Sequence, residues 1–180
     1  MPAYVAILRG INVSGQKKIK MDSLQALFEK LGMSQVTTYI QSGNIVFISK
    51  LSKQAELQRI IEDGIKKEYG FSVPVLLLTK SQLKKAIKDN PYPEDNIDAK
   101  KLYFTFVDKK PSKINIDKLN LTDIKGDEYQ IINNVVYVYC HGSYGKTKLS
   151  NTFLEKTLQI NATTRNWNSV NKLAEIIESY

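Results

Sequence analysis

The sequence has little of the material from which most catalytic and metal sites are built, because it contains one cysteine, Cys140, and one histidine, His141. A single cysteine excludes an internal disulfide, and one cysteine with one histidine falls short of a zinc site. The two residues are adjacent at the end of an expected strand, so their side chains point to opposite faces and cannot readily pair as nucleophile and base. We therefore expect no metal and no cofactor, and the sequence leaves the catalytic residues of any enzymatic activity unknown.

Long hydrophobic runs are missing as well. The longest apolar runs lie at residues 4–8 and 73–78, far short of the roughly 20 residues that a membrane span needs. Residues 1–4 lack the charged start and the apolar centre of a secretory signal. We therefore expect a cytoplasmic protein with no membrane partner.

Positive charge is what the sequence has in excess. It contains 26 Lys and Arg against 18 Asp and Glu, which gives a formal net charge of +8. Residues 1–50 hold half of this excess, with six Lys and Arg against two Asp and Glu. A basic protein attracts phosphate-bearing partners. An anionic small molecule or a nucleic acid is therefore the expected partner, and a basic surface that only keeps the protein in solution is the alternative.

The spacing of apolar residues predicts the same order of elements in both halves of the chain. In the first half, strands are expected at 4–8, 36–40, 45–48 and 73–78, and helices at 22–31 and 52–69. In the second half, strands are expected at 102–107, 128–132, 135–140 and 160–164, and helices at 114–121 and 148–158, with a closing helix at 166–179. The order β-α-β-β-α-β is that of the ferredoxin-like arrangement.

The predicted fold class is therefore α+β: two packed ferredoxin-like units (βαββαβ, the alpha-beta plait) with an added C-terminal helix. A short helix at 81–88 must end before Asn90-Pro91, and the polar stretch that follows contains Pro93. We predict one unit with a linker helix over residues 1–94 and a second unit with the terminal helix over residues 95–180. A monomer is the expected oligomeric state.

Three segments resemble a known bacterial family. They are LRGINV at 8–13, YIQSGNIVF at 39–47 and TTRNWN at 163–168. Together, and in this order, they resemble domain of unknown function family 1697, and the resemblance covers essentially the whole chain. It implies a cytosolic bacterial protein built from two ferredoxin-like units, and it implies no activity.

The first two segments supply most of the candidate ligand-binding residues. Arg9, Asn12 and Lys17 lie in a glycine-containing loop between a strand and a helix, where backbone N–H groups can approach an anion. The loop matches neither the dinucleotide fingerprint nor the P-loop spacing, so Asn12 and the glycines could instead serve only a tight turn. Gln41, Ser42 and Asn44 offer amides and a hydroxyl to a polar ligand, but the same residue types form hairpin turns.

The third segment supplies Arg165, Asn166 and Trp167. An arginine beside a helix N-terminus favours anion binding, and a tryptophan can stack on a base or another ring. The alternative is structural, with Asn166 as an ordinary N-cap and Trp167 as a core aromatic.

Three hypotheses fit these residues. In the first, all the candidates converge on one basic, polar site that binds a phosphate-bearing ligand or nucleic acid. This hypothesis leads the other two, because it requires the fewest residues that are missing from the sequence. In the second, the protein is an enzyme that acts on a small metabolite without a metal, through amides and arginines that stabilise negative charge. In the third, the motifs are purely structural and hold the two units together.

Overall fold

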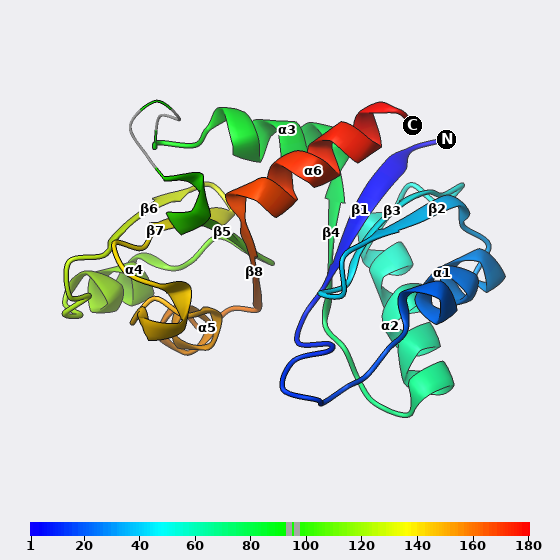
Figure 1. The fold of residues 1–180 in the computed structure, drawn as a ribbon, viewed down its shortest axis with the longest axis horizontal. Helices are drawn as coiled ribbons and strands as arrows, with labels where there is room; N and C mark the ends of the chain where they lie inside the picture. The colour runs from blue at the N-terminus through cyan, green and yellow to red at the C-terminus, as the bar shows by residue number, and fades with distance from the viewer. Residues whose placement is uncertain (93–94, 96–97) are drawn as a thin grey trace. The chain divides into compact units, whose positions relative to one another are not determined.

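The computed structural model describes residues 1–92, 95 and 98–180 (Figure 1). It is a mixed α+β structure with two four-stranded sheets, in which every paired strand is antiparallel to its neighbour. The chain forms two compact units: unit 1 contains Met1–Lys84 and Lys172–Tyr180, and unit 2 contains Lys85–Asn171. Among the described residues, no helix combines the length and the hydropathy that crossing a bilayer requires.

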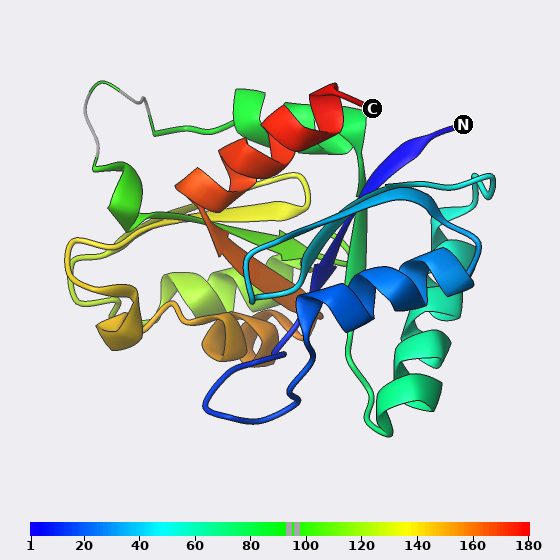
Figure 2. The ribbon, with the colours of Figure 1, turned by 45° about the vertical axis from the view of Figure 1, so that its right-hand side comes forward.

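Unit 1 has a sheet with the strand order β2-β3-β1-β4. The strands are β1 (Ala3–Leu8), β2 (Ser34–Tyr39), β3 (Asn44–Ile48) and β4 (Val75–Thr79). The helices are α1 (Met21–Lys30) and α2 (Gln54–Tyr69), and α3 (Lys80–Lys88) begins in this unit. Helices α1 and α2 lie on the same side of the sheet (Figures 1 and 2).

The core of unit 1 forms between this face of the sheet and the two helices. Alternation along β1 turns Tyr4, Ala6 and Leu8 toward the same face, where they join one buried cluster with apolar residues of α1 and α2. Phe28 of α1 meets Phe47 of β3 edge-on, with 5.3 Å between the ring centroids. The core of unit 1 is therefore built from apolar residues of the predicted strands and helices.

Unit 2 has a sheet with the strand order β6-β7-β5-β8. The strands are β5 (Leu102–Val107), β6 (Glu128–Ile132), β7 (Val135–Tyr139) and β8 (Ala162–Asn166). The helices are α4 (Lys113–Asn120) and α5 (Asn151–Leu158), with short 3-10 turns at Ala99–Lys101 and Tyr144–Lys146, and α6 (Trp167–Glu178) begins in this unit. Leu119 of α4 and Leu154 of α5 are buried in one cluster with Val136 and Val138 of β7.

Two helix starts differ from the sequence prediction. The helix expected from residue 22 begins one residue earlier, at Met21, so Asp22 lies in the first turn of α1. There its negative charge still favours the N-terminal end of the helix dipole. Helix α5 begins at Asn151 rather than at 148, because the Ser150 hydroxyl accepts a hydrogen bond from the Phe153 N–H and caps the helix at that point.

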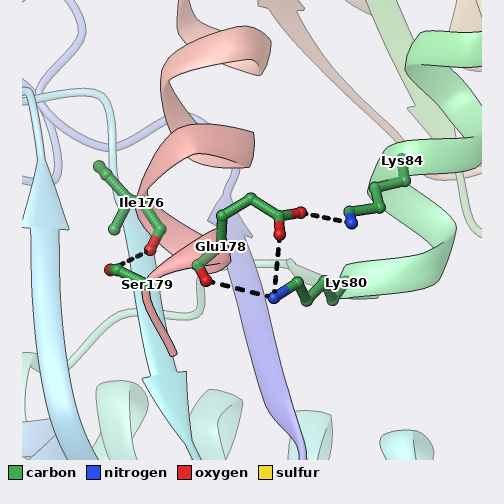
Figure 3. A network of polar contacts seen from close by, with 5 residues as sticks. All are labelled: Lys80, Lys84, Ile176, Glu178 and Ser179. Atoms are coloured by element: carbon green, nitrogen blue, oxygen red, sulfur yellow. Dashed lines mark hydrogen bonds and ion pairs between the residues drawn. The ribbon is translucent and has the colours of Figure 1, made fainter.

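The last residues of the chain belong to unit 1, where ion pairs hold the end of α6 to the start of α3 (Figure 3). Glu178 Oε1 lies 2.6 Å from Lys84 Nζ and Glu178 Oε2 lies 3.2 Å from Lys80 Nζ. Lys80 Nζ also donates to the Glu178 carbonyl oxygen at 3.4 Å. The hydrogen bond from Lys84 has the largest effect on the pKa of the Glu178 carboxyl, and with Lys80 it holds this pKa below its usual value.

The division between the units therefore runs at residues 84–85 and 171–172. The predicted boundary between residues 94 and 95 involves residue 94, which lies outside the described residues, as does Pro93. Division at residues 1–94 and 95–180 stays a prediction.

Candidate functional site

The loop of residues 9–20 joins β1 to α1 in unit 1 and has an unusual backbone. Gly10, Asn12, Ser14, Gly15 and Lys17 all have positive φ angles, between 45° and 75°. Non-glycine residues adopt this left-handed region only where the surroundings hold them there. Several N–H groups of the loop are bonded within the protein, since Asn12 N–H donates to the Lys17 carbonyl oxygen and Gln16 N–H to the Val13 carbonyl oxygen.

Asn12 holds the loop in this shape. Its Nδ2 donates to the Ile19 carbonyl oxygen at 2.9 Å and to the Gln41 carbonyl oxygen at 2.8 Å, and its Oδ1 accepts from the Ile19 N–H at 2.9 Å. The Asn12 N–H also donates to the Lys17 carbonyl oxygen at 3.2 Å. Asn12 thus closes the loop on itself and ties it to the β2–β3 turn, which supports a structural role for its side chain.

The cations of the loop lie on its surface. Lys17, Lys18 and Lys20 are exposed, whereas Arg9 is half-buried at the end of β1, where its N–H donates to the Pro74 carbonyl oxygen at 3.0 Å. Lys17 Nζ donates to the Ser72 carbonyl oxygen at 2.8 Å. An ammonium has three donors, so this bond leaves two for a ligand.

Lys18 and Lys20 were absent from the residues chosen by sequence reasoning. Neither lysine forms an ion pair with any residue that the structure describes. The sequence does contain a pattern that points to them, because residues 9–20 include four Lys and Arg and no Asp or Glu. The whole loop, rather than three chosen positions in it, is the cationic feature.

The β2–β3 turn packs closely against the loop of residues 9–20. Gly43 has a φ of 79°, and a Cβ atom there would lie 2.7 Å from Ile11 Cδ1 and 2.8 Å from Leu8 Cβ, so only glycine fits this close approach. Asn44 is fully buried, and its Nδ2 donates to the Tyr39 carbonyl oxygen at 3.0 Å and to Ser42 Oγ at 2.9 Å.

Among the candidates in this turn, the structure brings Gln41 to Asn12 through its carbonyl oxygen, and Ser42 to Asn44 through its hydroxyl. The side chain of Gln41 is exposed, Ser42 is half-buried and Asn44 is enclosed. The buried amide of Asn44 serves the turn. The hairpin interpretation therefore accounts for its side chain.

The candidates at 165–167 lie in unit 2. Arg165 Nη1 donates to the Thr164 carbonyl oxygen at 2.8 Å, and burial lowers the pKa of its guanidinium to about 10. A pKa of about 10 keeps Arg165 cationic at neutral pH. Asn166 Oδ1 accepts from the Ser169 N–H at 2.8 Å, which is ordinary N-capping of α6.

Trp167 is a core residue of this segment. Its side chain is 5% exposed and packs against Phe104 of β5, with 5.3 Å between the ring centroids. A buried indole has no free face for a base, so the packing supports the structural alternative. The convergence of Arg165, Asn166 and Trp167 with the candidates of unit 1 on one site remains a prediction.

Cys140 and His141 have different surroundings. Cys140 is buried, and burial raises the pKa of its thiol to about 11. His141 is exposed, and its Nε2 lies 2.9 Å from Glu128 Oε2. Across residues 1–92, 95 and 98–180, no group of three or more His, Cys, Asp or Glu side chains is placed to hold a metal ion.

Comparisons with known proteins identify the family. The family described as "protein of unknown function (DUF1697)" matches residues 1–137, which include the segments at 8–13 and 39–47 but not the one at 163–168. The conserved bacterial protein SP0830 from Streptococcus pneumoniae has a similar structure, with a TM-score of 0.79, 24% sequence identity and 99% of both chains covered. At this identity the likeness concerns the fold. No curated protein matches the chain. The chain belongs to the DUF1697 family.

Proposed function

We propose that this protein binds a phosphate-bearing ligand, either a phosphorylated small molecule or a nucleic acid, at the loop of residues 9–20. The observation that carries the proposal is a loop with three exposed lysines, a half-buried arginine and no carboxylate, in which five residues have positive φ angles. Fixing the backbone in advance removes an entropic cost of binding. The lysines that the loop carries then act on the same anion.

The strength of such a site depends on several cations acting together. One ammonium about 4 Å from a phosphate charge contributes roughly 1 kcal/mol in water and about 4 kcal/mol at a partly shielded surface. Salt screens charges at an exposed loop over a distance of about 8 Å under physiological conditions. Binding should therefore weaken steeply as salt is added.

Within this proposal, the candidates divide by role. Lys17, Lys18 and Lys20 contact the ligand together with Arg9, whereas Asn12 shapes the loop through its hydrogen bonds to Ile19 and Gln41. Asn44 shapes the β2–β3 turn through its hydrogen bonds to Tyr39 and Ser42. The loop is better suited to binding than to catalysis, because its charged side chains are lysines and an arginine, which attract an anion, and it contains no carboxylate, imidazole or thiol.

We also propose that each unit is a ferredoxin-like plait. The support is the strand order β2-β3-β1-β4 in unit 1 and β6-β7-β5-β8 in unit 2, each within an antiparallel sheet. The two helices that connect the strands lie on one face of each sheet, which is what the β-α-β-β-α-β order requires (Figures 1 and 2).

The proposed function is tested by removing the loop cations together. The variant Lys17→Gln/Lys18→Gln/Lys20→Gln is compared with Lys53→Gln/Lys66→Gln/Lys67→Gln, which removes the same charge from exposed positions at the ends of α2. The probes are sodium pyrophosphate, followed by calorimetry, and a labelled single-stranded RNA of about 12 nucleotides, followed by fluorescence anisotropy, each at low and physiological salt.

We expect the loop variant to bind at least one probe about tenfold or more weakly than the control variant does. If only RNA binds, the ligand is a nucleic acid; if only pyrophosphate binds, it is a small phosphorylated molecule. Equal losses in both triple variants would show a general effect of net charge and contradict the site. Absence of binding by both probes at low salt would contradict the function.

A further inference from the structure

Strand β6 presents a free edge in unit 2. It is the end strand of its sheet and pairs only with β7. Ile132 and Val135 flank the two-residue turn of this hairpin and form a hydrogen-bonded pair, so the N–H and C=O groups of Tyr129 and Ile131 point away from β7. Among the described residues, neither Tyr129 nor Ile131 forms a main-chain hydrogen bond outside the sheet. These two residues can therefore pair with one more strand.

A groove of about 610 Å³ runs beside this edge, between β6 and α4. The side chains of Tyr129 and Ile131 lie on the same face of β6, and with Ile116 of α4 they form the apolar part of its wall. Tyr129 OH donates to Asn120 Oδ1 at 2.5 Å and so links the strand to the helix. The groove is open to solvent rather than enclosed. Side chains of an added strand would enter it at alternate positions.

Helix α4 keeps apolar side chains on its surface. Leu121, directly after the helix, is 88% exposed, and Ile114, in its first turn, is 69% exposed. Apart from Met1, these are the most exposed large hydrophobic residues in the described parts of the chain. Neither residue lines the groove, and helical geometry places both on the face of α4 away from Ile116 and Asn120, so they are no part of the surface beside β6.

Charge decides which kind of partner fits. Of the residues that the structure describes, Lys110 is the only charged one that lines the groove, and it lies shortly before α4. A partner with a carboxylate at this position would form an ion pair there. A second copy of this chain carries a formal charge of +8 and would be repelled, which disfavours pairing of β6 with its own copy.

We propose that β6 binds an extended, acidic segment of another protein by strand addition. The outward N–H and C=O groups of Tyr129 and Ile131 supply four main-chain hydrogen bonds, and the groove takes apolar side chains from every second residue of the segment. Lys110 selects a carboxylate on the segment. This surface lies in unit 2 and does not depend on the loop of residues 9–20.

The test begins with a phage-displayed library of random heptapeptides, selected on the full chain. We expect enriched sequences in which apolar residues alternate with others and at least one residue is acidic. The enriched peptide is then synthesised, and its affinity is measured for the natural chain, for Lys110→Glu and for the matched control Lys109→Glu. Lys109 is the exposed neighbour of Lys110 and does not line the groove. Lys110→Glu should weaken binding about tenfold or more, and Lys109→Glu about twofold at most.

A second arm separates strand addition from simple charge attraction. N-methylation of alternate backbone amides of the peptide removes the hydrogen-bond donors of one edge, so one of the two methylation patterns should abolish binding and the other should preserve it. Enrichment of no acidic sequence, equal losses in Lys110→Glu and Lys109→Glu, or equal effects of both methylation patterns would overturn the proposal. A dimer in sedimentation that Lys110→Glu alters and that excludes the peptides would overturn it in favour of a second copy.

Discussion

Two segments with similar residue types have opposite surroundings in this molecule. The loop of residues 9–20 and the segment of residues 163–168 both combine arginine, asparagine and small polar residues next to a helix start. In the loop, Lys17, Lys18 and Lys20 are exposed, whereas in the segment Trp167 is 5% exposed and burial lowers the pKa of Arg165. The loop presents its lysines to solvent, whereas the segment places Trp167 in the core of unit 2. Under the proposed function, this difference in burial rather than residue type separates a binding role from a structural one.

The largest expected effect comes from Trp167→Ala. Removing a buried indole that packs against Phe104 should lower the free energy of unfolding by about 3–5 kcal/mol. Urea titration followed by circular dichroism measures this change. Leu121→Ala, at an 88% exposed position, is the matched control and should change stability by about 0.5 kcal/mol or less. A loss below about 1 kcal/mol for Trp167→Ala would move the indole out of the core and break the comparison.

Gly43→Ala should have the next largest effect, because it introduces both backbone strain and a steric clash. The left-handed backbone costs about 1–2 kcal/mol for a residue with a Cβ atom, and the contact with Ile11 adds a cost of similar size. The control is Gly32→Ala, where φ is 89° but no atom lies within 4 Å of the new Cβ. Thermal unfolding should show a clearly larger loss for Gly43→Ala; equal losses would mean that the turn does not pack under the loop.

Asn12→Ala should affect stability less and ligand binding more. The variant leaves the Ile19 N–H and the Ile19 and Gln41 carbonyl oxygens without their partner, at a cost of about 1–2 kcal/mol. It keeps every lysine but releases the loop, so pyrophosphate should bind more weakly although the charge is unchanged. Calorimetry at low salt measures this loss. Unchanged affinity would show that charge alone, without the fixed backbone, carries binding.

The smallest expected effect is the pH dependence of stability that Cys140 causes. It appears only at alkaline pH and leaves stability at neutral pH unchanged. Burial raises the pKa of the thiol to about 11, so at pH 8 only about one molecule in a thousand carries the thiolate. The neutral thiol favours the folded state, and this contribution is lost as the pH rises from the ordinary thiol value toward 11. Ellman's reagent should react slowly with the folded chain and rapidly in urea. Rapid reaction of the folded chain would contradict burial in the core.

Local sequence patterns predicted most of the fold. The apolar run of residues 4–8 and the helical spacing of Leu24, Leu27 and Phe28 depend only on nearby residues, so they located β1 and α1 to within one residue. The start of α5 was missed because the Ser150 cap depends on which of several polar residues the chain selects. The place of Lys172–Tyr180 in unit 1 could not be read from the sequence, because it depends on contacts such as Glu178 with Lys84 across a long sequence separation.

The candidate site was predicted less completely. The charge of residues 9–20 was visible, and it located the loop without showing which cations are exposed. The hydrogen bonds of Asn12 to Ile19 and Gln41 need the folded loop, since no local pattern specifies them. The burial of Trp167 depends on Phe104, a residue far away in the sequence. Sequence patterns thus indicated where polar residues gather, and packing determined which of them can meet a ligand.

The most direct test of the central claim is an NMR titration of the ¹⁵N-labelled chain with sodium pyrophosphate at low salt. The account expects the amide signals of residues 10–18 to shift progressively and to saturate, because the anion binds at the lysines beside these amides. The signals of residues 163–168 serve as the internal comparison and should shift less. Shifts confined to residues 163–168, or spread evenly over the lysines of the whole surface, would contradict the assignment of the binding site to the loop.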